Sequence, residues 1–333
     1  MSTRHILFLT TGGTIASIAG ENGLAPAAGP DIAHIAGSSF GCTVAVKEMF
    51  RLDSSNIQPE EWQQIAAEID ASRNLYSGIV ITHGTDTLAY TAAVLSYMLQ
   101  GIRIPVVLTG SQLPFGHPLS DALDNLRTAF AMACSGRGGI YVAFNRKVLL
   151  GTRAVKARTR SFNAFESINL APVATEDARG LVFAGKAPAR GEYRYRPAVC
   201  AEVFLLKLIP GTAPAALRGL AALGYKGLVI EAFGAGGLHV LRRNLVQELH
   251  SIIEAGTSVV VVSQCLYEPS DFTLYEVGRQ ALSAGVIEGR DMTSEAAVTK
   301  LMWALANTES PAGVKALFKT SLAGEITLVP GGE

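Results

Sequence analysis

The chain lacks a long apolar segment, since none of its runs reaches the ~18 residues that a membrane-spanning helix requires. It also lacks an excess of charge of either sign, because 28 basic residues balance 28 acidic residues in a chain of 333. A nucleic-acid-binding protein would need a basic surface, which this balance does not favour. We therefore expect neither a membrane nor a nucleic acid as a partner.

Cysteine is scarce as well. The four cysteines lie far apart and show no Cys-x-x-Cys or Cys/His spacing of the kind that binds zinc; they are Cys42, Cys134, Cys200 and Cys265. We expect free thiols and no metal site. The first residues move directly into a short strand-like run without the apolar core of a secretory leader, which predicts a cytoplasmic protein.

Apolar residues are plentiful, at 49% of the chain, so a large core can form. Strand-like runs alternate with helical patterns, which predicts an α/β protein: a larger N-terminal domain with a doubly wound, mostly parallel sheet, and a smaller, Rossmann-like C-terminal α/β domain. A basic, aperiodic, proline-bearing stretch interrupts the pattern. We expect an N-terminal catalytic domain over 1–185, a linker over 186–200 and a C-terminal domain over 201–333.

Individual elements follow from the apolar periodicity and from proline and acidic residues at helix starts. The expected strands are 5–10, 43–49, 78–82, 105–109, 139–143, 203–208, 227–231 and 258–263. The expected helices are 60–73, 88–99, 121–133, 214–223, 243–255, 295–306 and 311–317.

Thr14 follows Gly12 and Gly13 just after the first strand, at the sheet edge where α/β proteins bind ligands. Glycines there let a ligand approach the backbone, and a threonine hydroxyl can act as a nucleophile if a base activates it. The alternative is a phosphate-binding loop in which Thr14 caps a helix. The segment has neither G-x-G-x-x-G nor G-x-x-x-x-G-K-[ST], so we favour catalysis.

Thr85 and Asp86 follow the strand 78–82 and are expected at the same edge. Asp86 could cap the next helix, or it could bind the ammonium group of an amino-acid substrate. His83 is expected to have a structural role. Two hydroxyl groups and a carboxylate in one crevice favour the hydrolysis of an acyl compound.

Lys156 lies in a segment rich in basic residues, which is typical of a solvated face. A lysine packed beside a threonine could instead take a proton from its hydroxyl. The residues alone do not distinguish Lys156 from Lys147 or Arg153. The cluster 53–56 is similarly ambiguous: it could form a turn only, or a turn that also holds a substrate carboxylate. The stretch 21–30 could be a mobile lid or an ordinary loop.

Together these segments resemble the bacterial-type L-asparaginase family, in particular its cytoplasmic type I branch. Residues 11–16 (TGGTIA) are similar to the first active-site signature of the family, and residues 82–87 (THGTDT) to the second. The likeness continues through 52–56, 109–114, 157–169 and 285–300, and so covers nearly the whole chain.

The resemblance implies hydrolysis of the side-chain amide of L-asparagine to aspartate and ammonia, without a cofactor, in a homotetramer built as a dimer of dimers. Thr14 matches the nucleophile that forms an acyl-enzyme, and Thr85, Asp86 and Lys156 match a second catalytic group. The expected substrate-binding residues are Asp53, Ser54, Ser55, Thr85 and Asp86. The chain departs from many relatives at Leu24, where a lid tyrosine is expected.

Two other functions are compatible with the pattern. One is the ammonia-releasing subunit of a transfer-RNA amidotransferase, although such a subunit is expected to have an additional N-terminal domain and a basic RNA-facing surface. The other is a non-catalytic amino-acid-binding protein of the same fold. Contact between Lys156 and the threonines would favour the hydrolase.

Overall fold

A computed structural model describes residues 4–20, 23–26, 39–185 and 191–327. The chain divides into two compact units, residues 1–197 and 198–333, so the division falls inside the segment 186–200 that we expected to be a linker. Of that segment, residues 186–190 lie outside the described residues, and Arg194–Tyr195 form a short strand. None of the helices in the described parts is long and apolar enough to cross a membrane.

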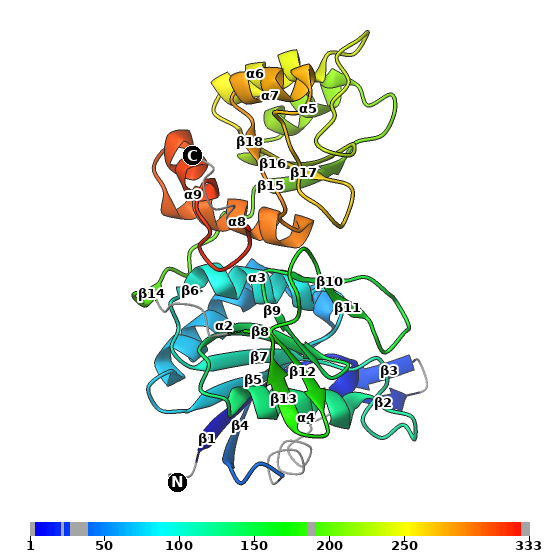
Figure 1. Ribbon diagram of the computed structural model, residues 1–333, viewed down its shortest axis with the longest axis vertical. Coiled ribbons are helices and arrows are strands. Elements are labelled where there is room, and N and C mark those ends of the chain that lie inside the picture. Colours follow the sequence, from blue (N-terminus) through cyan, green and yellow to red (C-terminus); the bar gives the residue numbers. More distant parts are fainter. Residues whose placement is uncertain (1–3, 21–22, 27–38, 186–190, 328–333) are drawn as a thin grey trace. The chain divides into compact units, whose positions relative to one another are not determined.

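The first unit is built on an eight-stranded sheet in the order β13-β12-β9-β8-β7-β5-β1-β4 (Figure 1). The five strands from β8 to β4 run parallel, and β9, β12 and β13 extend the sheet antiparallel to their neighbours. In chain order they are β1 (His5–Gly12), β4 (Thr43–Leu52), β5 (Gly78–Thr82), β7 (Pro105–Thr109), β8 (Gly139–Phe144), β9 (Lys147–Leu150), β12 (Ala174–Asp177) and β13 (Gly180–Phe183).

Helices cover both faces of this sheet, which is why β5 and β7 are buried along their whole length. Phe8 and Phe130 stack across the α4 side of the core, while the other side packs against α3. The helices are α2 (Pro59–Ser72), α3 (Leu88–Met98) and α4 (Ala122–Ala133). The doubly wound, mostly parallel sheet predicted from the alternating pattern is confirmed.

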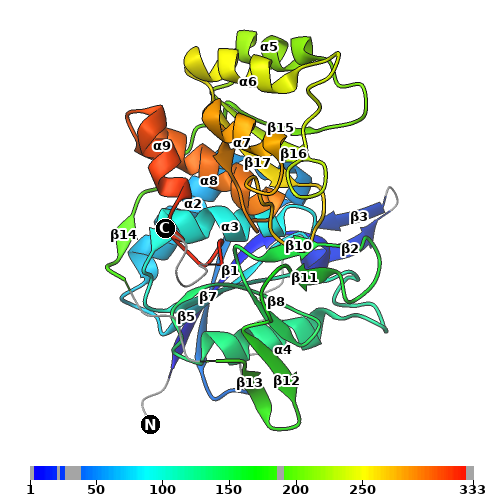
Figure 2. The ribbon, with the colours of Figure 1, turned by 45° about the horizontal axis from the view of Figure 1, so that its top comes forward.

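Three two-stranded ribbons complete the first unit. The hairpin of β2 (Ser17–Gly20) and β3 (Gly23–Pro26) projects from the sheet (Figure 2). The strands β10 (Ala154–Lys156) and β11 (Phe165–Ser167) pair beside α3. In the third ribbon β14 (Arg194–Tyr195) pairs with β6 (Leu99–Gln100), which joins the end of the unit to the end of α3.

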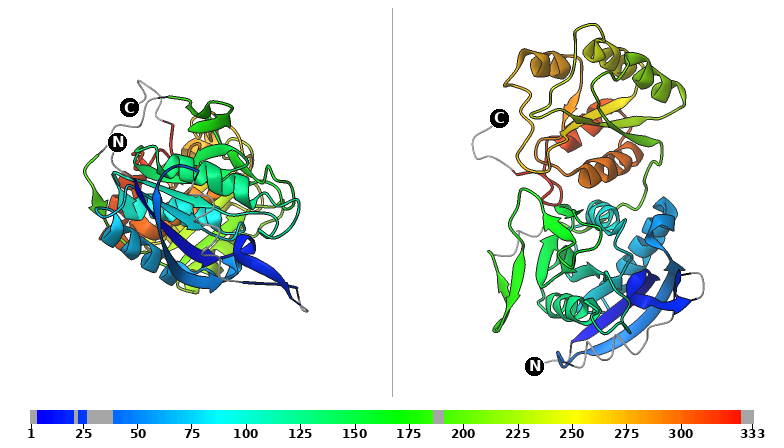
Figure 3. Two further views of the ribbon diagram at one scale, coloured as in Figure 1. Left: turned by 90° about the horizontal axis from the view of Figure 1, so that it is seen from below. Right: turned by 90° about the vertical axis from the view of Figure 1, so that its right-hand side faces the viewer.

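The second unit contains a four-stranded parallel sheet with helices on both faces (Figure 3). Leu217, Leu249 and Ala281 bring three helices onto one face, and α8 packs against the other. The strands are β15 (Val203–Lys207), β16 (Gly227–Ala232), β17 (Ser258–Ser263) and β18 (Ile287–Glu288). The helices are α5 (Pro214–Ala222), α6 (Leu245–Glu254), α7 (Glu276–Ser283), α8 (Ser294–Asn307) and α9 (Pro311–Phe318).

Candidate active site

Four loops of the first unit meet at one edge of its sheet. The strands β7, β5, β1 and β4 are neighbours and run parallel, so the segments that follow them leave at the same edge. Those segments carry the residues predicted from the first and second signatures and from the cluster after β4. They are Gly13–Thr14 after β1, residues 53–56 after β4, residues 83–87 after β5 and residues 110–113 after β7.

Glycines allow these loops to touch through their backbones. Gly13 has a φ of +81° and lies so close to Gly84 that an added Cβ would be 2.5 Å from the Gly84 nitrogen. A Cβ on Gly84 would in turn lie 2.6 Å from the Ser54 Oγ. The first signature therefore packs on the second, and the second on the cluster after β4. Thr14 is half-buried and begins the short 3-10 helix η1 (Thr14–Ala16) directly beside this contact.

Lys156 contacts both residues predicted beside it. Its Nζ donates a hydrogen bond of 2.8 Å to the Thr85 Oγ1 and lies 2.5 Å from the Asp86 Oδ1. The Thr85 side chain is buried and that of Lys156 is 17% exposed, whereas that of Asp86 is 63% exposed. The lysine–threonine contact is thus shielded from bulk water, while the Asp86 carboxylate stays accessible from outside.

This geometry distinguishes Lys156 from the two basic residues that the sequence left open. The Nζ of Lys147 lies 3.5 Å from the Asn163 Oδ1, and Arg153 is buried at the start of the segment that leads to β10. The hydrogen bonds of Lys156 join it to Thr85 and Asp86 of the second signature.

The helix-capping interpretation of Asp86 is wrong. The cap position of α3 is Thr87, whose hydroxyl donates to the Ser54 carbonyl over 2.7 Å. The Asp86 carboxylate instead forms the ion pair with Lys156, and its backbone N–H donates to the Ser54 Oγ. The side chain is therefore held by Lys156 and does not cap the start of α3.

The cluster after β4 forms a capped turn. The Asp53 carboxylate accepts hydrogen bonds from the Ser55 backbone N–H (2.8 Å) and hydroxyl (2.6 Å), and it caps the 3-10 helix η2 (Ser54–Asn56). These hydrogen bonds hold the pKa of Asp53 below its ordinary value, so the group stays ionised. Ser54 is buried against Gly84, and Ser55 is exposed.

His83 is buried with both ring nitrogens engaged. Its Nδ1 lies 2.7 Å from the Gly84 carbonyl oxygen and its Nε2 3.0 Å from the Thr91 hydroxyl, which also accepts a hydrogen bond from Trp62. Burial lowers the pKa of His83 to about 4, so the ring is neutral at pH 7. In the neutral ring Nδ1 donates to Gly84 and Nε2 accepts from Thr91, as expected for a structural histidine.

Gln112 and Asp121 hold the loops but were not assigned a role from the sequence. The Gln112 side-chain amide donates to the carbonyls of Thr159 and Ser161, so it ties the loop after β7 to the segment after Lys156. The Asp121 carboxylate accepts from the backbone N–H groups of Gln112 and Leu113. Asp121 was predicted as the first residue of the helix 121–133, where an acidic residue is an ordinary signal for a helix start, and this concealed its loop-binding role.

The lid region is described in part. Leu24 lies on β3, opposite Ala19 of β2, and residues 21–22 and 27–30 of the predicted lid fall outside the described residues. In the parts of the chain that the structure covers, histidine, cysteine and acidic side chains form no group of three or more that could hold a metal ion.

This arrangement is that of a two-domain α/β amidohydrolase. Residues 5–188 match the family described as "Asparaginase, N-terminal", and residues 202–318 match the "Glutaminase/Asparaginase C-terminal domain". The chain belongs to the asparaginase family, as its two signatures predicted.

Known proteins resemble the chain over nearly its whole length. It is 44% identical to an L-asparaginase of Thermococcus kodakarensis over 97% of this chain and 99% of that protein. A solved structure of the thermostable L-asparaginase from this organism superposes with a TM-score of 0.92, at 43% identity and over 98% of this chain and 100% of that one. A crystal structure of L-asparaginase I from Vibrio cholerae superposes with a TM-score of 0.88, at 31% identity and with the same coverage. The chain is also 36% identical to a glutamyl-tRNA(Gln) amidotransferase subunit of T. kodakarensis, over 97% of this chain and 76% of that protein.

Proposed function

We propose that the chain is an L-asparaginase that hydrolyses the side-chain amide of L-asparagine to L-aspartate and ammonia through a threonine acyl-enzyme. Its membership of the asparaginase family supports this activity. The observation that carries the mechanism is the hydrogen bond between the Lys156 Nζ and the Thr85 Oγ1, in a loop whose backbone packs against the Thr14 loop.

In the first step the Thr14 Oγ attacks the amide carbon of the substrate. The tetrahedral intermediate carries a negative oxygen, which backbone N–H groups at the glycine turn can stabilise. The C–N bond then breaks, the nitrogen takes up a proton, and ammonia leaves while an ester to Thr14 is formed. In the second step a water molecule adds to the ester. The tetrahedral intermediate that forms then breaks down, which releases aspartate and restores the Thr14 hydroxyl.

Thr85, Lys156 and Asp86 supply the proton transfers. Lys156 donates to Thr85 and pairs with Asp86 as an ammonium, so it acts as a base only after it has released a proton to solvent. The neutral amine then accepts the Thr85 proton, which lets the Thr85 oxygen act as a base toward Thr14 or toward water. The ion pair with Asp86 fixes the position of the Nζ from its other side. Every proton step thus uses side chains of the protein, and we expect full activity in the presence of a chelator.

The two charged groups of the substrate, both on its α-carbon at the opposite end from the reacting amide, are bound by different residues. The exposed Asp86 carboxylate suits the α-ammonium group, and the hydroxyls of Ser54 and Ser55 suit the α-carboxylate. Asp53 fixes the turn that presents the two serines, and the Thr85 hydroxyl borders the amide.

We further propose that the protein is a cytoplasmic homotetramer, arranged as a dimer of dimers. The likeness to type I enzymes supports both statements. Light scattering of the purified protein would give its mass in solution, and cell fractionation would give its compartment; a monomer, or protein outside the cytoplasmic fraction, would contradict the respective statement.

Ammonia release from L-asparagine, L-glutamine and D-asparagine tests the activity. We expect turnover of L-asparagine by the wild type, and its loss in Thr14→Ala and in Thr85→Val. Thr175→Val, at an exposed threonine of β12, is the matched control and should retain full activity. Activity that persists in Thr14→Ala would rule out Thr14 as the nucleophile, and activity that persists in Thr85→Val would rule out the second catalytic group.

The likeness to a glutamyl-tRNA(Gln) amidotransferase favours one alternative, in which the chain releases ammonia for a partner enzyme that acts on transfer RNA. Turnover by the isolated chain distinguishes the two. Rapid hydrolysis of free L-asparagine supports the asparaginase, whereas no turnover of any free amide would favour the role in an amidotransferase or a non-catalytic amino-acid-binding protein.

A further inference from the structure

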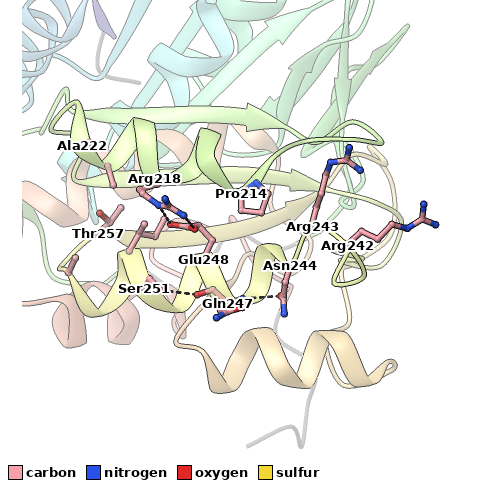
Figure 4. Close-up of a pocket in the computed structure, with 13 residues that line it drawn as sticks. Pro214, Arg218, Ala222, Arg242, Arg243, Asn244, Gln247, Glu248, Ser251 and Thr257 are labelled. Atoms are coloured by element: carbon pink, nitrogen blue, oxygen red, sulfur yellow. Dashed lines mark hydrogen bonds and ion pairs between the residues drawn. The ribbon is translucent and has the colours of Figure 1, made fainter.

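A pocket of about 820 Å³ lies wholly within the second unit, between α5 and α6 (Figure 4). Its volume is within the ~300–1,000 Å³ range of sites that bind small molecules. Pro214, Ala222 and Ile252 give it apolar walls, and Ser251 and Thr257 add hydroxyl groups. All of these residues belong to the C-terminal unit, so the pocket is distinct from the site around Thr85.

Arginine supplies most of the charge of the pocket. Arg218, Arg242 and Arg243 line it, and among its lining residues, all of which the structure describes, Glu248 is the one acid. Glu248 is held by Arg218 through two hydrogen bonds, of 3.0 Å from Nε and 2.6 Å from Nη2. Because this pair is internally neutral, the net positive charge among the lining residues comes from Arg242 and Arg243, whose side chains extend away from the Arg218–Glu248 pair (Figure 4).

The Arg218–Glu248 pair also fixes one wall of the pocket. Hydrogen bonds from the guanidinium hold the pKa of the buried Glu248 carboxylate below its ordinary value, so it remains ionised. Two of the five N–H donors of Arg218 are used in this pair, and its side chain is 69% exposed. The remaining donors are available to a ligand from a guanidinium that is already oriented.

The other end of the pocket is formed by the start of α6. Arg242 and Arg243 immediately precede Asn244, which caps this ten-residue helix, and both arginine side chains are exposed (Figure 4). The N-terminal end of a helix carries a partial positive charge that adds to theirs. Guanidinium groups bind phosphate oxygens in pairs, which favours them over lysine at phosphate sites.

We propose that this pocket binds a ligand through a phosphate dianion, with Arg242 and Arg243 as the principal charged contacts and Arg218 as a pre-oriented donor. Two positive charges match a phosphate dianion, and the apolar walls and the volume leave room for an organic group attached to it. The ligand is thus free phosphate, or a phosphate ester whose organic group contacts the apolar walls. None of the residues that line the pocket belongs to the proposed amide-hydrolysis site.

Isothermal titration calorimetry at low salt tests the proposal, with inorganic phosphate, adenosine 5′-monophosphate and adenosine as probes. We expect saturable binding of at least one phosphate-bearing probe and none of adenosine. A phosphate affinity equal to that of the nucleotide would assign the site to free phosphate, and a tighter nucleotide would assign it to a phosphate ester. Absence of saturable binding of both, or equal binding of adenosine and its monophosphate, would overturn the proposal.

Variants locate the binding. The double variant Arg242→Ala/Arg243→Ala should weaken the affinity at least about ten-fold, the effect of losing charge-assisted hydrogen bonds. The matched control Lys315→Ala/Lys319→Ala also removes two positive charges, on α9 and at its end, and should leave it unchanged. An equal loss in the control and in the arginine variant would show general electrostatic attraction and overturn the assignment.

Discussion

The Lys156 Nζ lies 2.8 Å from the Thr85 Oγ1, although 71 residues separate them in the chain. The two residues come from different elements, since Thr85 follows β5 and Lys156 ends β10. Their contact converts a basic segment that would ordinarily face solvent into part of a candidate catalytic group. It also makes the proposed mechanism directly testable at Lys156.

Lys156→Met should abolish most of the ammonia release. The substitution keeps the length of the side chain but removes the amine that would accept the Thr85 proton, and loss of such a proton transfer costs about 10²–10⁴ in kcat. Steady-state kinetics with L-asparagine would measure it. Lys147→Met, at the basic residue of β9, is the matched control and should leave kcat unchanged. A Lys156→Met enzyme within a few-fold of the wild-type kcat would contradict the role of Lys156.

Gly13→Ala should impair both activity and folding of the first unit. A Cβ at this position would lie 2.5 Å from the Gly84 nitrogen, and the φ of +81° is unfavourable for alanine. We expect a loss of stability on the order of 1–3 kcal/mol and a large fall in kcat. Gly116→Ala is the matched control, because nothing lies within 4 Å of a Cβ there. Denaturant unfolding and ammonia release would compare the two; equal behaviour would show that the two signature loops are not in tight contact.

His83 should make the first unit less stable in acid. Burial lowers its folded pKa from 6.5 to about 4, so between these values the unfolded chain binds a proton that the folded protein does not. The neutral His83 therefore allows the full free energy of unfolding above pH 6.5. This free energy decreases as the pH falls toward 4. The loss is on the order of 3 kcal/mol, at about 1.4 kcal/mol for each pH unit.

The two tryptophans allow this effect to be measured in one unit. Trp62 lies in the first unit and Trp303 in the second, so Trp303→Phe leaves a fluorophore that reports on the first unit alone. In this background His83→Gln should flatten the rise of unfolding free energy between pH 4.5 and 7. His117→Gln, at an exposed histidine, is the control. An unchanged slope in His83→Gln would show that His83 is not the group that titrates.

Local pattern predicted the parallel core of both units but not the antiparallel edge. The strands 78–82, 105–109 and 258–263 have the predicted bounds, because continuous apolar runs between turn residues mark strands covered on both faces. The strands β12 and β13 were missed. Each has only four residues and several exposed positions, and β12 (ATED) carries little apolar signal, so pairing with a neighbour determines them.

The candidate site, like the fold, could be predicted from the sequence only in part. The positions of Thr14 and Thr85 at one sheet edge follow from strands that precede them and run parallel. The choice of Lys156 over the other basic residues does not follow from the strand order. It depends on the β10–β11 ribbon, whose three-residue strands have no distinctive sequence pattern. Asp86 could be placed at the start of a helix, but only the fold shows that Thr87 occupies the cap and leaves the carboxylate to Lys156.

The second unit depends on a buried ion pair. Lys300 of α8 and Glu325 are both fully buried and bonded to each other, and Glu325 also accepts from the backbone N–H groups of Leu322 and Ala323. Burial lowers the pKa of Lys300, and the Glu325 carboxylate opposes this. The pair therefore ties the segment after α9 to α8 and requires both charges.

Glu325→Gln should destabilise the second unit by about 3–5 kcal/mol, because it leaves the Lys300 ammonium buried without a counter-charge. Fluorescence of Trp303 in a Trp62→Phe background would report its unfolding. Glu202→Gln, at the exposed pair of Glu202 with Lys226, should cost less than about 1 kcal/mol. The apolar double variant Lys300→Met/Glu325→Leu should recover much of the loss, because it removes both buried charges together. Failure of the double variant to recover would show that the hydrogen bonds that Glu325 accepts from the backbone, and not its charge, hold the C-terminal segment in place.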